Sequence, residues 1–123
     1  MSATTIDNVK RTFTTNATAT IAKYSLVKLD TDGSVSVATQ SNSEVRAGFL
    51  DADNTAVSEP VSVVLLNGGG TAYGIAASTI TNAGTALYGA TTGKVGTTAT
   101  GSIVGYTLES GASANDVIEI LLA

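Results

Sequence analysis

Histidine and cysteine are absent from this chain of 123 residues. Without cysteine, the chain can form neither a disulfide nor a thiolate metal site. Without histidine, it lacks the side chain that most often serves as a general base near neutral pH and as a metal ligand. These two absences argue against the commonest forms of acid–base and metal catalysis.

Aromatic and charged residues are scarce as well. Tryptophan is absent, aromatic residues make up 5% of the chain and charged residues 13%. Aromatic side chains bury more surface than any others, so a core built from valine, leucine, isoleucine and alanine would be modest. That composition leaves room for an oligomer to supply further burial.

Long apolar runs are also missing. No stretch approaches the roughly 20 apolar residues of a membrane span, so we expect no membrane partner. The basic pair Lys10 and Arg11 is followed by polar residues rather than by an apolar block. We therefore expect no signal peptide.

The charge is unevenly distributed. Residues 1–28 carry four basic side chains and one acidic one, giving +3, whereas residues 29–123 carry two basic and nine acidic ones, giving −7. A basic segment on an acidic body argues against nucleic acid as the main partner. The segment is either a solvated tail or a part that docks on an acidic protein surface.

The residues that are abundant favour β-structure. Threonine and valine suit strands because branching at Cβ packs well on a pleated surface, and 13 glycines with one proline indicate many tight turns. We predict an all-β fold, a small β-barrel or β-sandwich of about eight to ten short strands. The predicted strands are 24–30, 34–38, 45–51, 61–66, 71–76, 85–89, 94–98, 103–109 and 116–122.

Two segments carry specific expectations within this pattern. Thr31–Gly33 should form a hairpin turn, because glycine tolerates the positive φ that tight turns need. The run Val61–Leu66 should be a strand buried on both faces, because it is continuously apolar and too short for a helix.

The chain divides into two predicted parts, an extended N-terminal arm over residues 1–20 and a single β domain over residues 21–123. The arm is polar and threonine-rich, with isolated apolar residues at Ile6, Val9 and Phe13. Such a segment cannot bury enough apolar surface to order itself, so we expect it to lie on a partner.

Three segments resemble ligand-binding loops but lack residues that such loops require. Gly89–Val95 is one residue too short for a phosphate-binding loop and has valine where magnesium needs a hydroxyl. Asp30–Gly33 and Asp51–Asn54 begin like calcium loops but lack the later glycine and glutamate. A weak cation site at Asp51 and Asp53 stays open as an alternative to a plain loop. We expect no catalytic residue, no cofactor and no enzyme.

Several segments resemble a family of small bacteriophage capsid-decoration, or cement, proteins. In that family an apolar segment containing Ala-Gly and Leu-Tyr precedes a Lys-Val turn strand, an Ile-x-Gly strand and a closing apolar strand. The resemblance covers residues 20–123. It is carried by ITNAGTALY (80–88), GSIVGYTLE (101–109), DVIEILL (116–122), IAKYSLVKL (21–29) and RAGFL (46–50).

The resemblance implies a structural virion protein made in the host cytoplasm. Relatives bind the outer surface of the assembled head, commonly as homotrimers, and clamp neighbouring major capsid proteins. An extended arm is suited to adding a strand to an exposed capsid edge, and we expect residues 4–15 to do so. Deleting them should then abolish capsid binding and leave the body folded. The proposed capsid-binding side chains are those of Ile6, Val9, Lys10, Arg11 and Phe13.

Two other roles remain open at this point. The chain could be a carbohydrate- or receptor-binding β module of a phage fibre, although such modules usually present more aromatic side chains. It could also be a tail-tube-like structural subunit.

Overall fold

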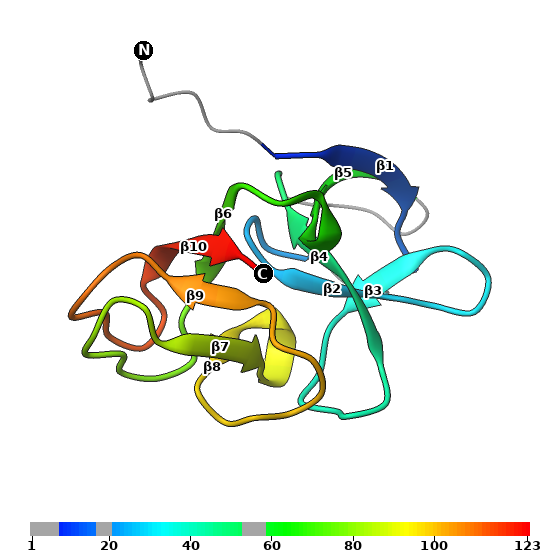
Figure 1. The fold of residues 1–123 in the computed structure, drawn as a ribbon. Helices are drawn as coiled ribbons and strands as arrows, with labels where there is room; N and C mark the ends of the chain where they lie inside the picture. The colour runs from blue at the N-terminus through cyan, green and yellow to red at the C-terminus, as the bar shows by residue number, and fades with distance from the viewer. Residues whose placement is uncertain (1–7, 17–20, 53–58) are drawn as a thin grey trace, which may run out of the picture.

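The computed structural model describes residues 8–16, 21–52 and 59–123. These ranges contain ten strands and two single-turn 3-10 helices, η1 and η2 (Figure 1), which confirms the all-β prediction. No helix in the described ranges is long and apolar enough to cross a membrane. The elements are β1 (Lys10–Thr14), β2 (Leu26–Leu29), β3 (Val35–Val37), β4 (Val45–Leu50), β5 (Pro60–Leu65), η1 (Leu66–Gly68), β6 (Thr71–Ile75), β7 (Ala86–Gly89), η2 (Thr91–Gly93), β8 (Val95–Gly96), β9 (Gly105–Thr107) and β10 (Val117–Leu122).

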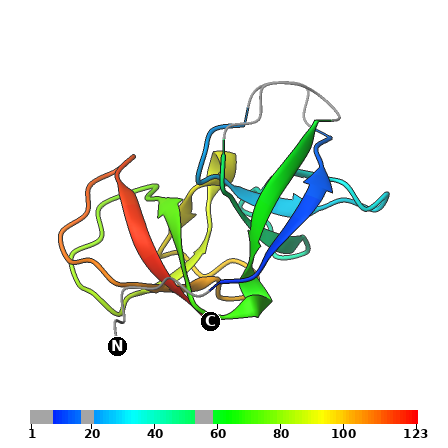
Figure 2. The same cartoon turned by 90° about the horizontal axis from the view of Figure 1, so that it is seen from above.

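The strands form two five-stranded antiparallel sheets that lie side by side (Figure 2). The first has the order β1-β5-β4-β2-β3 and the second the order β6-β10-β9-β7-β8. Each sheet curls until its two edges meet through one parallel bridge. Thr15, just after β1, bridges Val35 of β3, and Ala76, just after β6, bridges Val95 of β8. The two curled sheets, with ten strands in all, confirm the predicted barrel-like or sandwich architecture.

Turn chemistry positions the first hairpin as predicted. β2 and β3 pair antiparallel, and Gly33 in the connecting turn has a φ of 85°. The amide and the hydroxyl of Ser34 both donate hydrogen bonds to Asp32. These bonds stabilise the carboxylate and hold the pKa of Asp32 below its usual range.

The segment that resembles a phosphate-binding loop forms a second hairpin. η2 connects β7 to β8, which pair antiparallel with Gly89 opposite Val95. Gly93 in this turn has a φ of 73°. The glycines of this segment therefore serve a turn between strands, and no helix follows them to present its N-terminus to a phosphate.

The two sheets are copies of one topological unit. Their strand orders are identical once each strand of the second sheet is matched to the strand five places earlier. The registers match too, because Val27 lies opposite Gly48 in the first sheet and Leu87 lies opposite Gly105 in the second. We call residues 8–65 the first half and residues 69–123 the second half.

Backbone hydrogen bonds outside the strands repeat in the same way. The N–H of Tyr24 donates to the carbonyl of Leu50 over 3.0 Å, and its equivalent Gly84 donates to Thr107 over 2.7 Å. Tyr24 and Gly84 also share a positive φ, 71° and 81°. The chain is therefore a tandem structural repeat. Further equivalent bonds are Leu50 to Ser25 with Thr107 to Thr85, Leu65 to Val9 with Leu122 to Gly70, and Asp51 to Ser62 with Leu108 to Glu119.

Part of the predicted N-terminal arm, Lys10–Thr14, forms β1 of the first sheet. Lys10 to Thr14 pair with β5 along the whole strand, from Lys10 opposite Val64 to Thr14 opposite Pro60. Phe13 is buried in the core of the first half. A segment with one large apolar residue becomes ordered because β5 supplies the backbone partners and the first half covers the ring. Deleting residues 4–15 would remove this strand, so the body is not expected to survive that deletion intact.

Alternating side chains of each sheet fill the interior of its own half. β5, predicted to be buried on both faces, lies between β1 and β4 and points Val61 and Val63 inward. In the second half Ile118 and Ile120 of β10 take the equivalent places. Each half therefore has its own small core. The core inside the first sheet consists of Phe13, Ile21, Val27, Val35, Leu50, Val61 and Val63.

The second half packs on the outer face of the first sheet. Phe49 and Val64 point out of the first half, yet both belong to the core of the second. A Cβ placed on Gly74 would lie 2.9 Å from Cε1 of Phe49. The ring of Phe49 thus enters the open end of the second half at a glycine that has no side chain to obstruct it.

Arg46 joins the two halves by hydrogen bonds. Its side chain is 5% exposed and its Nε lies 3.1 Å from Oε1 of Glu44, which is 6% exposed. Its Nη1 donates to the carbonyl of Thr100 in the second half. The guanidinium passes directly over Gly89, where any larger residue would collide with it. A buried charge is tolerated here because the carboxylate and the carbonyls accept hydrogen bonds from the N–H groups of Arg46.

Candidate binding surfaces

The residues predicted to bind a capsid are in part used by the fold itself. Phe13 is buried, and the Arg11 guanidinium lies over its ring at 4.7 Å from the centroid. Val9 is half exposed and packs beside Gly68 of η1. Lys10 pairs with Asp51, and Ile6 lies outside the described residues. The structure brings Arg11 and Phe13 together but leaves their predicted role in capsid binding a prediction.

The ion pair of Lys10 and Asp51 also bears on the open cation site. Lys10 Nζ lies 2.9 Å from Asp51 Oδ2, so this carboxylate already has a cationic partner, while Asp53 lies outside the described residues. Across the part of the chain that the structure describes, no group of three or more acidic side chains is arranged to hold a metal ion.

Removing this ion pair should have little effect on folding. The side chains of Lys10 and Asp51 are 48% and 40% exposed, and exposed pairs contribute at most about 1 kcal/mol. Lys10→Met is therefore expected to lower the free energy of unfolding by less than about 1 kcal/mol, as measured by urea denaturation at low and high salt. A loss of several kcal/mol that persists in high salt would contradict this interpretation.

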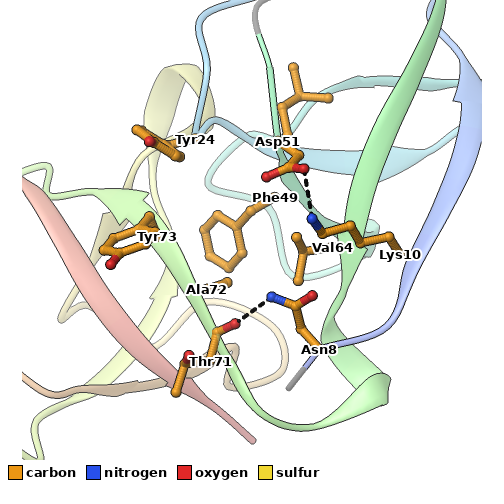
Figure 3. A pocket seen from close by; sticks show the side chains of 10 residues that line it. Asn8, Lys10, Tyr24, Phe49, Asp51, Val64, Thr71, Ala72 and Tyr73 are labelled. Carbon is orange, nitrogen blue, oxygen red and sulfur yellow. Dashed lines mark hydrogen bonds and ion pairs between the residues drawn. The ribbon is translucent and has the colours of Figure 1, made fainter. Parts of the chain in front are cut away.

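A small groove lies between the two halves, with the Lys10–Asp51 pair on one side of it (Figure 3). Tyr24 and Tyr73 lie next to each other on the other side, in a tilted ring contact with centroids 5.6 Å apart. Asn8 donates a hydrogen bond to the carbonyl of Thr71 and so ties the start of the described chain to β6. The groove has a volume of about 180 Å³, below the roughly 300 Å³ at which small-molecule pockets begin. It does not indicate an enzyme active site.

A second groove opens at the end of the first half. It has a volume of about 260 Å³ and a mainly apolar lining that includes Phe13, Leu29, Val45 and Leu65, with Arg11 at its edge. Val45 is 63% exposed. We call these five residues the first-half groove. An exposed apolar lining of this kind is typical of a surface that a partner covers.

The outer face of the second sheet is a further apolar surface. Tyr106 of β9 lies opposite Leu121 of β10, and both are exposed. Leu108 and Tyr73 lie on either side of Glu119 on the same face. We call Tyr73, Tyr106, Leu108 and Leu121 the second-half face.

The sequence prediction identified neither apolar surface. One signal was present in DVIEILL (116–122), where apolar residues occupy both alternating sets of positions. That pattern indicates a strand covered on both faces. The structure covers one of them, because Ile118 and Ile120 are buried and Val117 and Leu121 are not.

Comparisons with known proteins support the fold. No family model matches the chain, and no curated protein matches its sequence. Among solved structures, the chain is similar to the crystal structure of the N base of head fiber gp8.5 in bacteriophage phi29. The TM-score is 0.66, and the match covers 94% of this chain and 95% of that chain at 19% sequence identity. At this level of identity the likeness shows that the two chains share a fold.

Proposed function

We propose that this protein is a structural component of a phage virion that binds the outer surface of the assembled head. The observation that carries the proposal is the likeness to a phage head-fiber base over nearly the full length of both chains. The resemblance of residues 20–123 to capsid-decoration proteins supports it independently. The absence of histidine and cysteine fits a role without catalysis.

In this role the protein acts as a clamp between neighbouring major capsid proteins, and it does so as a homotrimer. A ligand that binds only the assembled lattice stabilises it by mass action, by about 2.7 kcal/mol per site when its concentration is 100 times Kd. Summed over the many binding sites of a head, this stabilisation opposes the internal pressure of the packaged DNA. No nucleic acid, membrane or cofactor takes part.

Co-sedimentation tests the proposal directly. The purified protein is mixed with DNA-filled heads, with empty unexpanded heads and with isolated tails of the phage that encodes it. We expect it to pellet with DNA-filled heads at high salt, and to raise the temperature at which they release DNA. Pelleting with tails alone would support a tail-tube subunit and overturn the head proposal.

A second candidate function is a module of a head fibre. It is favoured because the similar structure is the base of a head fiber. The fibre module would either attach a fibre to the head or bind a carbohydrate or receptor. Binding to a glycan array, with no effect on the temperature of DNA release, would favour receptor binding over the clamp.

The N-terminal segment provides a specific test of head binding. Lys10–Thr14 already pair with β5 in the first sheet, so among the predicted capsid-binding side chains we choose Ile6 for the test. Ile6→Asp is expected to lower the affinity for heads at least about tenfold, which corresponds to about 1.4 kcal/mol.

The neighbouring substitution Thr5→Asp is the matched control, because it adds the same charge without removing an apolar side chain. Both variants should keep the thermal stability of the parent protein. Equal affinity of the two variants would contradict a role for Ile6.

A further inference from the structure

The contact between the two halves is head-to-tail. It joins the outer face of the first sheet to the open end of the second half, so two different surfaces of the repeated unit meet. Phe49 and Val64 supply the face, and Ala72 and Gly74 of β6 lie in the open end that receives it. Such a contact leaves two surfaces unused, the outer face of the second half and the open end of the first half.

The unused face lies on the second half. The register of β4 with β5 and of β9 with β10 makes Tyr106 the equivalent of Phe49 and Leu121 the equivalent of Val64. Phe49 is 1% exposed and Val64 is 5% exposed, whereas Tyr106 is 39% and Leu121 is 44% exposed. The same apolar positions are therefore buried in one half and open in the other.

The unused open end is the first-half groove. The pairing of β1 with β5 and of β6 with β10 makes Arg11 the equivalent of Ala72 and Phe13 the equivalent of Gly74. Leu65, which is only partly buried, corresponds to the buried Leu122. The groove thus has the same place in the first half as the end that Phe49 enters in the second.

We propose that the second-half face of one copy of this chain docks in the first-half groove of another copy. The contact inside the chain is the template, because the surfaces that meet there are the structural equivalents of the two that remain exposed. The occupant is therefore a second copy rather than an unrelated protein. The inference rests on the self-association included in the proposed function.

Side chains at the two surfaces are suited to such a contact. Phe13 takes the position of Gly74, beside which Phe49 lies in the second half. The incoming Tyr106 therefore lies over the groove rather than deep inside it. Arg11, already over the Phe13 ring, provides a guanidinium on which a second aromatic ring can stack. Glu109 and Glu119, joined by a hydrogen bond at 2.8 Å, add negative charge beside the face that meets this cation.

Head-to-tail contacts repeat until a ring closes, so every copy uses both surfaces. In a homotrimer three equivalent contacts would bury the second-half face and the first-half groove of all copies. That burial supplies apolar contacts beyond the two small cores within the chain. The contact would also cover Val45 of the groove and Leu121 of the face, which are both exposed in the single chain.

Size-exclusion chromatography with light scattering tests the contact on the intact protein. The parent protein should form a closed oligomer, whereas Leu121→Glu on the face and Val45→Glu in the groove should each give monomers. Val117→Glu is the control, because it adds the same charge on β10, where its equivalent Pro60 is exposed in the first half. It should remain oligomeric. Circular dichroism and urea denaturation establish that each variant is folded.

Mixing the two variants distinguishes this head-to-tail contact from a contact between two identical surfaces. The Leu121→Glu variant keeps an intact groove and the Val45→Glu variant keeps an intact face, so an equal mixture should form dimers although neither does alone. A monomeric parent protein, oligomers in either folded variant, or no dimer in the mixture would each overturn the proposal. Head binding by a monomeric parent protein would overturn the docking contact and the proposed homotrimer, and would leave only the proposed binding to the head standing.

Discussion

Replacing Gly48 by alanine is expected to destabilise the protein by about 4 kcal/mol or more, which places it among the most damaging single substitutions. A Cβ at this position would overlap the backbone carbonyl of Val64 and would lie 3.0 Å from Cγ1 of Val63. Backbone atoms of a central strand cannot move aside without parting β4 from β5. Since small domains have only about 5–15 kcal/mol of total stability, a loss of this size removes a large part of it.

The tandem repeat predicts the same result at a second site. Gly105 is the equivalent of Gly48, and a Cβ there would overlap the carbonyl of Leu121. Gly96→Ala is the control, because its Cβ would meet nothing closer than Ala90 Cβ at 3.5 Å. Urea denaturation should place the control within about 1 kcal/mol of the parent protein. A similarly small loss for both Gly48→Ala and Gly105→Ala would show that β4 and β9 do not lie as close to their neighbours as described.

Local chemistry in the sequence was sufficient to predict the strands from β2 to β10 and the turn between β2 and β3. Alternating apolar residues and the Thr31–Gly33 turn identified β2 and β3, and the continuous apolar run identified β5. These signals depend only on residues close in sequence, so they can be recognised in a single sequence.

The repeat was missed because few of its equivalent residues are identical. Positions such as Val27 and Leu87, or Tyr24 and Gly84, share burial or backbone conformation rather than chemistry. Turn glycines such as Gly93 were the only signal of a repeat in the sequence. Because glycines occur throughout the chain, they did not reveal it. Topology and register reveal the repeat, and both depend on pairing between distant strands.

Long-range pairing also explains why β1 and the two apolar surfaces were not predicted. The ring of Phe13 looks isolated in a threonine-rich segment, and only its place opposite Val61 buries it. Tyr106 and Leu121 look like ordinary strand residues until the covered equivalents in the first half identify their face as open. A sequence alone does not state which of two similar faces is covered.

Phe49 should be the aromatic residue on which the junction of the two halves depends most. It is 1% exposed, and its Cε1 would lie 2.9 Å from a Cβ placed on Gly74 of the second half. Truncating a buried phenylalanine to alanine costs about 3–5 kcal/mol, through lost burial and the cavity that remains. Phe49→Ala is expected to lower the free energy of unfolding by that amount, as measured by urea denaturation at low protein concentration.

The equivalent substitution in the second half supplies the contrast. Tyr106→Ala removes a ring of similar size from the same place in the repeat, but that ring is 39% exposed. In the isolated chain its loss should cost less than about 1 kcal/mol, while the proposed docking should weaken and monomers should appear on dilution. If both substitutions destabilised the isolated chain equally, the face of the second half would already be covered within the chain. If instead Phe49→Ala mainly lowered the free energy of unfolding and Tyr106→Ala mainly weakened self-association, the equivalent faces would have different roles. The face of the first half would then hold the two halves of one chain together, and the face of the second half would hold copies of the chain together.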